Sequence, residues 1–422
     1  MKVLLSAYSC LPGGGSEPGI GWNWAKNIAA SGHSVTVVTR AVNRKSIEDH
    51  LAGEPIQQLR FLFCDLPRFC RPIYKLPFGN YCYYFMWQII AGREARKLHK
   101  VDPFELAQHI TWGSYRVPSF MGSLGVPFVF GPVGGGEDTP KLLRRGLGPR
   151  GRLSDAMRRI SGAILGLWMG STYKSADEIL VTTQETMENI PYRFRHKARV
   201  CQAVGIDAED FNGSSVARVP DSSRLELLFV GRLLPWKGVH LLLQALSRDG
   251  LRDRQVRLTI IGSGPDRKRL DRLVNDLALQ DKVHWIPWIP REELVRIYPK
   301  YDVFAFSSLH DSGGAAVLEA MANGLPVVCL DLGGPGVIVS NQCGRVVNTC
   351  ASGEDQVVAR LSRALEELDA DRTLLSRLSA GASERVLHLS WRANVVTAHG
   401  NRWTRQSHPA ENNSTLISSC SN

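Results

Sequence analysis

Two carboxylates in the second half of the chain stand in surroundings that indicate a bound ligand. Asp311 lies in a polar turn ahead of residues 312–314 (Ser-Gly-Gly), and Glu319 is the one charged residue in the apolar stretch 315–322. A carboxylate on a helix without a polar face needs a specific hydrogen-bond or ionic partner. Uncapped N–H groups at the start of that helix would favour an anion such as phosphate. The pattern predicts a site for a sugar attached to a phosphate.

A pair of cations precedes these carboxylates in the segment Gly-Arg-Leu-Leu-Pro-Trp-Lys-Gly, residues 231–238. Arg232 and Lys237 lie between the two glycines of that segment. At a turn from a strand to a helix, the two side chains can converge on one diphosphate, because Arg offers a two-pronged donor and Lys a point charge. The alternative is a pair of solvated cations on a surface loop.

The hydrophobic runs around these residues predict the scaffold that positions them. Val303–Phe306 and Pro326–Leu330 have the composition of buried strands, and with the helix 315–322 between them they form a βαβ unit. In open α/β sheets, ligands bind at the carboxyl edge of the strands, where the loops of such a unit lie. Further strands of this half are expected at 227–230, 258–262 and 283–286, and helices at 241–246, 355–368 and 371–386.

The first half of the chain shows the same alternation of strands and helices. Val3–Ala7, the loop 10–17, a helix that begins at Pro18 and the strand Val35–Thr39 form a Rossmann-like unit. A nicotinamide-dinucleotide site is not expected, because Pro18 stands in place of the third glycine and Arg40 in place of an acidic ribose ligand. Further strands are expected at 61–63, 106–110, 128–130 and 179–183.

A chain of 422 residues is long enough for two domains of about 200 residues each. The polar segment 204–224 is expected to link them. The first domain would then comprise residues 1–203 with a terminal helix at about 391–405, and the second domain residues 225–390. The Ser/Asn-rich tail 406–422 is expected to be disordered.

The excess positive charge is confined to the first half of the chain. Residues 1–200 hold 26 Lys and Arg against 15 Asp and Glu, whereas residues 201–422 hold 25 of each. Seven basic residues and one acidic residue fall within 141–159. This asymmetry indicates an anionic partner such as a phospholipid surface, a lipid-linked phosphate or a nucleic acid. The alternative for 141–159 is a solvated basic loop beside an ordinary core helix.

The cysteines, the acidic pairs and the apolar runs argue against several kinds of site. The nine cysteines are scattered and form no C-x-x-C pair, so neither zinc nor a disulfide framework is expected, and a reducing cytoplasm fits best. The Asp-x-Asp pair at 369–371 lies between two expected helices, away from any strand end, so no metal site is expected. The apolar stretch at the N-terminus is too short for a signal peptide. No apolar run in the sequence approaches the roughly 20 residues that a membrane-spanning helix needs. Any membrane contact should be peripheral, at the inner face of the plasma membrane.

The spacing of Asp311 and Glu319, followed by Ala-Met-Ala-Asn-Gly-Leu-Pro-Val-Val, resembles the E-x7-E signature of the retaining glycosyltransferases of family 4. That family has the GT-B fold, in which two Rossmann-like, doubly wound α/β domains face a central cleft and a C-terminal helix crosses back to the first domain. Asp311 departs from the family's first Glu; it keeps the charge and shortens the reach by one methylene. The resemblance therefore implies the reaction class more strongly than it implies a particular donor sugar. The resemblance covers most of the chain and is most specific over 227–336. The segments His-Asp-Ser-Gly-Gly and Gly-Ser-Glu-Pro-Gly-Ile-Gly-Trp-Asn-Trp-Ala also resemble members from bacterial exopolysaccharide assembly.

The resemblance implies roles for individual residues. Arg232 and Lys237 match the family's clamp on the leaving nucleoside diphosphate. Asp311 would face the donor sugar, and Glu319 would hold the ribose hydroxyls unless it is purely structural. His109 would stand beside the donor sugar, although a histidine at a strand end is otherwise more often a packing residue. The remaining donor-binding residues that the resemblance implies are Gly14, Gly15, Gly231, Gly262, Gly264, Trp288, Ile289, Ser312, Gly313 and Gly314.

Some of these assignments have simpler alternatives. The loop that contains Gly14 and Gly15 could be only a tight turn, and core packing accounts for Trp288 and Ile289 as well as base contact does. Residues 134–136 and Glu137 are further candidates for lining the cleft.

The resemblance implies a retaining, metal-independent transferase that moves a hexose from a nucleotide diphosphate sugar. The acceptor would be lipid-linked or a polysaccharide precursor, with 141–159 meeting an anionic membrane surface, and neither a cofactor nor a nucleic acid is expected. Two other classes share the fold. A sugar-nucleotide epimerase would need an additional set of acidic and histidine residues, which we do not find. A non-catalytic nucleotide-sugar-binding or scaffold protein is supported only by the replacement at Asp311.

Overall fold

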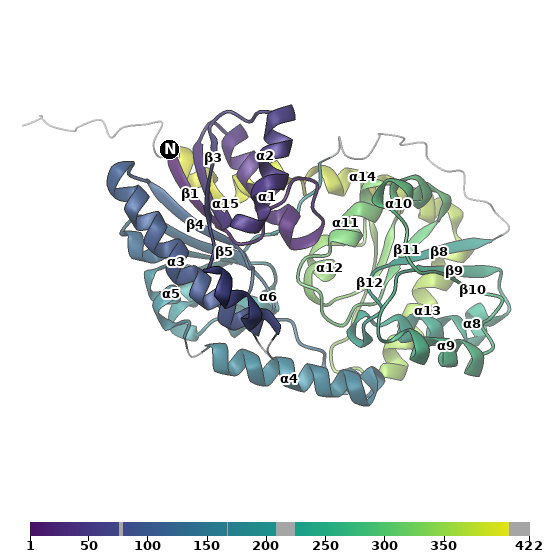
Figure 1. The fold of residues 1–422 in the computed structure, drawn as a ribbon. Coiled ribbons are helices and arrows are strands. Elements are labelled where there is room, and N and C mark those ends of the chain that lie inside the picture. The colour runs from purple at the N-terminus through teal and green to yellow at the C-terminus, as the bar shows by residue number, and fades with distance from the viewer. Residues whose placement is uncertain (76–78, 167, 208–223, 405–422) are drawn as a thin grey trace, which may run out of the picture.

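The computed structural model describes residues 1–75, 79–166, 168–207 and 224–404. In these residues the chain forms two parallel sheets, each flanked by helices, in two domains that lie side by side (Figure 1). The helix α4 (Gly148–Gly166) runs beneath both domains. Residues 208–223 of the expected linker and the tail 406–422 lie outside the described residues.

The first domain is built on a seven-stranded sheet of order β3-β2-β1-β4-β5-β6-β7. Its strands are β1 (Lys2–Ala7), β2 (Ser34–Arg40), β3 (Leu59–Cys64), β4 (Leu106–Thr111), β5 (Phe128–Val133), β6 (Glu178–Val181) and β7 (Ala198–Val200). Its helices, besides α4, are α1 (Ser16–Ala30), α2 (Arg44–Gly53), α3 (Gly79–Val101), α5 (Gly170–Ser175) and α6 (Gln184–Asn189). Every residue of β4 and β5 is buried, as expected for central parallel strands that helices cover on both faces.

The second domain is built on a six-stranded sheet of order β10-β9-β8-β11-β12-β13. Its strands are β8 (Leu225–Val230), β9 (Val256–Ile261), β10 (Val283–Ile286), β11 (Val303–Phe306), β12 (Val327–Leu330) and β13 (Gly344–Val347). Its helices are α7 (Val239–Leu246), α8 (Asp249–Arg252), α9 (Arg267–Asp276), α10 (Arg291–Ile297), α11 (Ala315–Ala322), α12 (Gly333–Ile338), α13 (Glu354–Ala370) and α14 (Arg372–Leu387).

The strand order reverses direction between β8 and β11, and this reversal decides where a ligand can bind. The two strands are parallel neighbours, with Val303 opposite Leu227 and Phe304 opposite Leu228. The turn after β8 carries the predicted cations, and the turn after β11 carries Asp311. Ligands of open α/β sheets bind at such a switch point, because the loops on its two sides diverge and leave a crevice.

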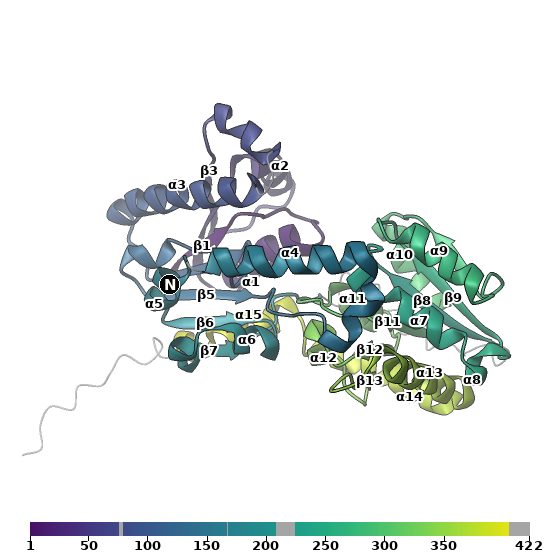
Figure 2. The ribbon, with the colours of Figure 1, turned by 90° about the horizontal axis from the view of Figure 1, so that it is seen from below.

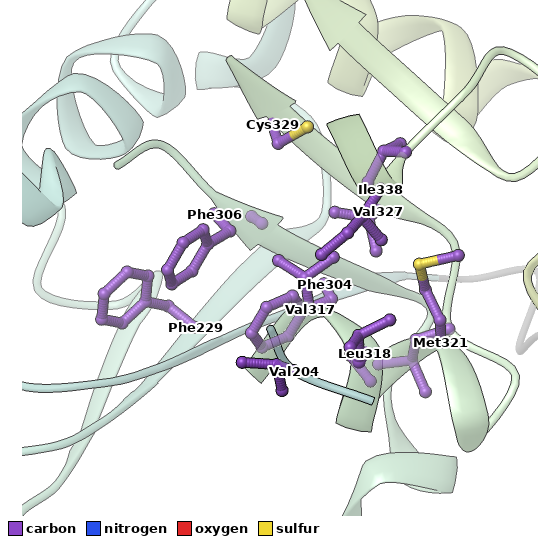
Figure 3. Packing of buried hydrophobic residues seen from close by; sticks show 14 of the residues in the cluster. Val204, Phe229, Phe304, Phe306, Val317, Leu318, Met321, Val327, Cys329 and Ile338 are labelled. Carbon is purple, nitrogen blue, oxygen red and sulfur yellow. The ribbon is translucent and has the colours of Figure 1, made fainter. Parts of the chain in front are cut away.

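The core of the second domain packs around β11 and α11. Phe304, Phe306 and Phe229 stack in series, with ring centroids 5.8 Å apart in each neighbouring pair. Figure 3 shows them with Val317 and Leu318 of α11, both of which are buried. This packing explains why α11 is apolar on nearly every side: it is covered almost all round.

The final helix, α15 (Trp391–Thr404), returns to the first domain, where it lies among the purple and blue elements of Figure 1. Its Asn394 Nδ2 donates to the carbonyl of Val204 (2.9 Å), and the carbonyl of Ala398 accepts from Arg199 Nη2 (2.9 Å). The expected fold class, two Rossmann-like domains with a helix that crosses back, is confirmed.

The alternative that we considered for 141–159, a solvated basic loop beside a core helix, does not describe the structure. Lys141–Leu147 forms a 3-10 helix, and Gly148–Gly166 forms one α-helix. Leu153, Met157 and Ile160 are exposed on it.

Candidate active site

The turn between β11 and α11 is organised by Asp311. Its Oδ1 accepts hydrogen bonds from the backbone N–H groups of Gly313 (3.1 Å) and Gly314 (2.9 Å). Gly314, the residue before α11, has a φ of 64°, which glycine adopts without strain. The expectation of uncapped N–H groups at this helix start is therefore wrong for these two groups, because the carboxylate of Asp311 already occupies them.

Lys237 connects this turn to the turn after β8. Its ammonium group forms an ion pair with Asp311 Oδ2 and lies 5.0 Å from the ring centroid of Phe306. Burial raises the pKa of Asp311, but the charge of Lys237 and its hydrogen bonds outweigh burial and leave the pKa below its usual value. The structure thus brings together two predicted residues that lie far apart in the sequence, with Asp311 held ionised.

Arg232 stands at the mouth of the same turn. Its side chain is exposed, and no ion pair joins it to another residue in the described part of the chain. An exposed guanidinium beside a half-buried ammonium group is a suitable arrangement for an incoming diphosphate.

Two of the predicted glycines let neighbouring turns come into contact. A Cβ on Gly262 would overlap the carbonyl oxygen of Gly231, and one on Gly264 would overlap that of Leu233. The turn after β9 can therefore lie directly against the turn after β8. These glycines set the shape of the diphosphate turn whether or not they contact a ligand.

Glu319 points from α11 to two polar partners. Its Oε1 lies 3.6 Å from Arg291 Nη2, and its Oε2 accepts a long hydrogen bond from the Tyr298 hydroxyl (3.5 Å). Burial raises the pKa of Glu319, against the opposing effects of Arg291 and Tyr298. Neither partner is at ideal distance, so the carboxylate retains capacity to accept hydrogen bonds from a ligand.

The two residues predicted for base contact lie in different environments. The Trp288 side chain is 74% exposed, so core packing does not explain it. Ile289 is half-buried and packs against the core of the domain.

His109 is not at a strand end and does not face the other predicted residues. It lies within β4, fully buried, with its ring stacked on Phe130 at 5.3 Å. Its Nε2 lies 3.5 Å from the Tyr84 hydroxyl and 3.4 Å from the carbonyl of Trp112. Burial lowers the pKa of His109 to about 4. In this conformation the ring has no surface with which to touch a substrate, which favours the packing interpretation.

The glycine loop of the first domain forms a tight turn before α1. The N–H of Gly14 donates to the carbonyl of Leu11 (3.2 Å), and Gly15 is the residue that precedes the helix. A Cβ on Gly14 would lie 3.0 Å from that of Pro18, whereas one on Gly15 would have no neighbour within 4 Å. The turn itself needs a small residue at Gly14, and Gly15 leaves an open backbone.

Two polar residues near the cleft were missed by sequence reasoning. His310 stacks on Trp236 at 5.2 Å, and burial, with the charges of Arg158 and Lys237, lowers its pKa to about 3. Its position directly before Asp311 was the available signal. Glu17 accepts from the N–H of Gly113 (2.6 Å), and burial raises its pKa.

The two domains meet at the Asp311 turn. Ser312 Oγ donates to Glu137 Oε2, and it accepts from the N–H of Gly135 at 3.0 Å. Gly313 lies against the connecting segment, where a Cβ would be 3.0 Å from Val204 Cγ2. Gly135 and Glu137 therefore lie at the contact between the two domains, and their lining of a donor site stays a prediction.

The described residues contain no group of three or more His, Cys, Asp or Glu that could hold a metal ion. Within the same residues, none of the helices is both long enough and apolar enough to cross a bilayer.

Comparison with known proteins gives the site its context. Residues 215–383 match the family model described as Glycosyl transferases group 1. The D-inositol 3-phosphate glycosyltransferase of Corynebacterium urealyticum is 35% identical over 178 residues, which is 38% of this chain and 42% of that protein. The chain thus aligns with less than half of this relative's length.

Solved structures match nearly the whole chain at low identity. Sucrose-phosphate synthase from Thermosynechococcus elongatus has a TM-score of 0.60 at 18% identity, with 96% of this chain and 98% of that chain covered. The Anabaena protein HepE in complex with UDP and glucose has a TM-score of 0.57 at 15% identity, with 96% and 99% covered. The chain has the two-domain GT-B fold of these solved structures, and residues 215–383 are similar to the group 1 glycosyl transferases.

Proposed function

We propose that this protein is a retaining, metal-independent glycosyltransferase that moves a hexose from a nucleotide diphosphate sugar to a lipid-linked or polysaccharide-precursor acceptor. The observation that carries the proposal is the ion pair of Lys237 with Asp311 at the switch point of the second sheet. It puts a cation for the diphosphate and a carboxylate for the sugar in contact, with the exposed Arg232 on the same turn.

The chemistry needs positive charge where the leaving group forms. Cleavage of the bond between the sugar and the diphosphate leaves the electron pair on a phosphate oxygen, and fixed cations lower the barrier by stabilising that charge. Lys237 and Arg232 are the cations available on this turn. Asp311, kept ionised, is able to accept hydrogen bonds from sugar hydroxyls, because its folded pKa is below the usual value.

The nucleoside would lie near Glu319 of α11 and Trp288, which follows β10. Glu319 is able to accept both vicinal hydroxyls of a ribose, since its present partners are 3.5 and 3.6 Å away. The exposed Trp288 is free of core packing and so offers a ring for a base. HepE binds UDP and glucose, and we propose a nucleotide-sugar donor of this general kind for the present chain.

Thermal-shift measurements with UDP-, GDP- and ADP-sugars test the donor. A ligand that binds only the folded state raises the melting temperature, by an amount that grows with its concentration relative to Kd. Transfer is then assayed with the donor that stabilises the protein most. A protein that no nucleotide sugar stabilises, and that neither transfers nor hydrolyses any of them, does not have the proposed function.

The membrane part of the proposal rests on α4, which Figure 2 shows from below as it extends from the first domain towards the second. Leu153, Met157 and Ile160 follow the spacing of one helical face, and all three are exposed. Arg150 and Arg152 are exposed on the same helix. An exposed apolar stripe flanked by basic residues is typical of a helix that lies in the interface of an anionic membrane.

The structure changes which cations are available for a lipid surface. Arg144, Arg158 and Arg159 each form an ion pair with the buried Asp155, at 3.7, 3.3 and 3.7 Å. These arginines hold the helix in place rather than offering their charges to lipid. The exposed cations of the segment are Lys141, Arg145, Arg150 and Arg152.

Co-sedimentation with vesicles that contain anionic phospholipid tests this surface. Changing Arg145, Arg150 and Arg152 to Ser should weaken binding, since each cation near such a surface contributes about 1 kcal/mol. The matched control changes three exposed cations of the second domain, Arg252, Arg257 and Lys268, to Ser. Equal sedimentation of the two triple variants and the wild type would refute this membrane surface without affecting the transferase proposal.

A further inference from the structure

Two carboxylates of the first domain contact the part of the second domain that carries Asp311. Glu137 accepts from the Ser312 hydroxyl, as described above. Glu185, on α6, accepts through Oε1 from the N–H of Gly333 at 3.1 Å. The next residue in that loop, Gly334, donates its N–H to the carbonyl of Asp311 at 2.7 Å. The first domain therefore holds the loops around Asp311 at two points.

The two oxygens of Glu137 have different kinds of partner. Oε1 accepts from the hydroxyls of Thr183 (2.6 Å) and Thr186 (2.8 Å), both in the first domain. Oε2 accepts from Ser312 of the second domain and from the N–H of Gly135 (3.0 Å). The residue is only 4% exposed, and a buried carboxylate is tolerated only when hydrogen bonds satisfy it. If the domains separated, Oε2 would lose the Ser312 hydroxyl as a donor and would meet water instead, so this contact exists only while the domains are together.

The backbone around this contact is shaped to allow it. A Cβ on Gly134 would lie 2.6 Å from the Cβ of Ser312, so no larger residue fits there. A second approach lies at α4, where a Cβ on Gly151 would be 2.7 Å from that of Pro235, next to the Lys237 turn. Residues of the first domain thus contact both the turn that carries Asp311 and the turn that carries Lys237.

We propose that Glu137 and Glu185 are positioning residues: from the first domain they fix the turn that carries Asp311, so that the sugar-facing side of the site is complete only when the two domains are closed. The kinetic part of this inference rests on the proposed function. The structural part, that these carboxylates hold the domains together, does not.

The test uses three variants, Glu137→Gln, Glu185→Gln and Ser312→Ala, in the full chain. Ser312→Ala removes the same interdomain hydrogen bond by deleting its donor in the second domain. It therefore still tests the contact if Glu137→Gln fails to fold. The matched control is Glu188→Gln, which neutralises an exposed carboxylate on the same helix as Glu185. Small-angle scattering measures the radius of gyration of the free proteins, and steady-state kinetics with the donor identified above measures kcat and donor KM.

We expect a larger radius of gyration and an about tenfold lower kcat in all three variants, which corresponds to about 1.4 kcal/mol of lost positioning. The Kd of the free nucleoside diphosphate should change by less than about twofold, because Arg232, Lys237 and Glu319, which we propose to bind it, all lie in the second domain. A radius of gyration and a kcat equal to those of Glu188→Gln would overturn the proposal, and so would a loss of nucleotide affinity that accounts for the whole kinetic effect. If the wild type transfers no sugar, the proposed function fails, and the scattering alone decides the structural part.

Discussion

Replacing Lys237 with Met should impair both stability and catalysis, and a second substitution should separate the two effects. Lys237 and Asp311 form a pair in which each side chain is less than one fifth exposed, at 18% and 17%. Without the ammonium group, the carboxylate of Asp311 keeps the N–H groups of Gly313 and Gly314 as its partners among the described residues. Leaving a buried charge without its counter-ion costs about 3–5 kcal/mol, and these two N–H groups reduce the cost to about 2–3 kcal/mol.

This loss should lower the melting temperature by about 5–10 °C for a domain of this size. Catalysis should fall independently, because removal of one cation from the developing diphosphate costs about 3 kcal/mol, or about a hundredfold in kcat/KM. The double variant Lys237→Met with Asp311→Asn removes the unpaired charge. It should regain most of the melting temperature and none of the activity.

The assays are differential scanning fluorimetry and donor turnover on the wild type, both single variants and the double variant. A double variant that melts as low as Lys237→Met would show that the ion pair does not account for the stability effect. Near-normal turnover by a folded Lys237→Met would refute the assignment of this lysine to the diphosphate clamp.

The remaining predictions concern the metal, the ribose contact and pH. Transfer should continue in excess EDTA, because we propose that Arg232 and Lys237 take the place of a divalent ion. Activity lost in EDTA and restored by Mg²⁺ or Mn²⁺ would contradict this. Glu319→Gln should weaken nucleotide binding while the melting temperature stays nearly constant, since the distances from Glu319 to its two present partners are long. Calorimetry measures the nucleotide affinity and fluorimetry the melting temperature. An unchanged affinity with a lowered melting temperature would identify Glu319 as a purely structural residue. The free energy of unfolding should fall as the pH drops from 7 to 5. Burial lowers the pKa of His109 to about 4 and that of His240 to about 3, whereas both histidines have a pKa of about 6.5 in the unfolded chain. The unfolded chain therefore takes up these protons first, which destabilises the folded state by about 2 kcal/mol for each residue by pH 5. The variant His109→Gln should show a shallower decline in chemical denaturation, and an unchanged slope would refute the burial argument.

The local composition of the chain was enough to predict the strands of the second domain and to select its candidate site residues. Apolar runs such as Val303–Phe306 and Pro326–Leu330 have no polar face, so they can only be central strands, and the structure places strands over Val303–Phe306 and Val327–Leu330. The turn residues follow from the same reasoning, because glycine and short polar residues mark the ends of those strands. Arg232, Lys237 and Asp311 became candidates by type and spacing alone, and their role in a ligand site stays a prediction.

What the sequence could not supply is the contact between groups that the fold brings together. Nothing in the spacing indicated that Lys237 pairs with Asp311, because that contact depends on β8 and β11 being neighbours in the sheet. His109 has the residue type of a catalytic group, but its position inside β4 buries it against Phe130. Burial depends on which elements cover a strand, and a single strand's sequence does not record that.

The helix α4 shows the same limit at the surface. Its sequence contains basic and apolar residues in proportions that suit either a loop beside a core helix or a helix exposed along one side. Only packing decides between them: Asp155 and Gly151 face inward, to three arginines and to Pro235, and this orientation leaves Leu153, Met157 and Ile160 exposed. Composition determined which groups this protein has, and the tertiary structure decided which of them meet, because electrostatic and hydrogen-bond partners are set by distance in space and not by distance along the chain.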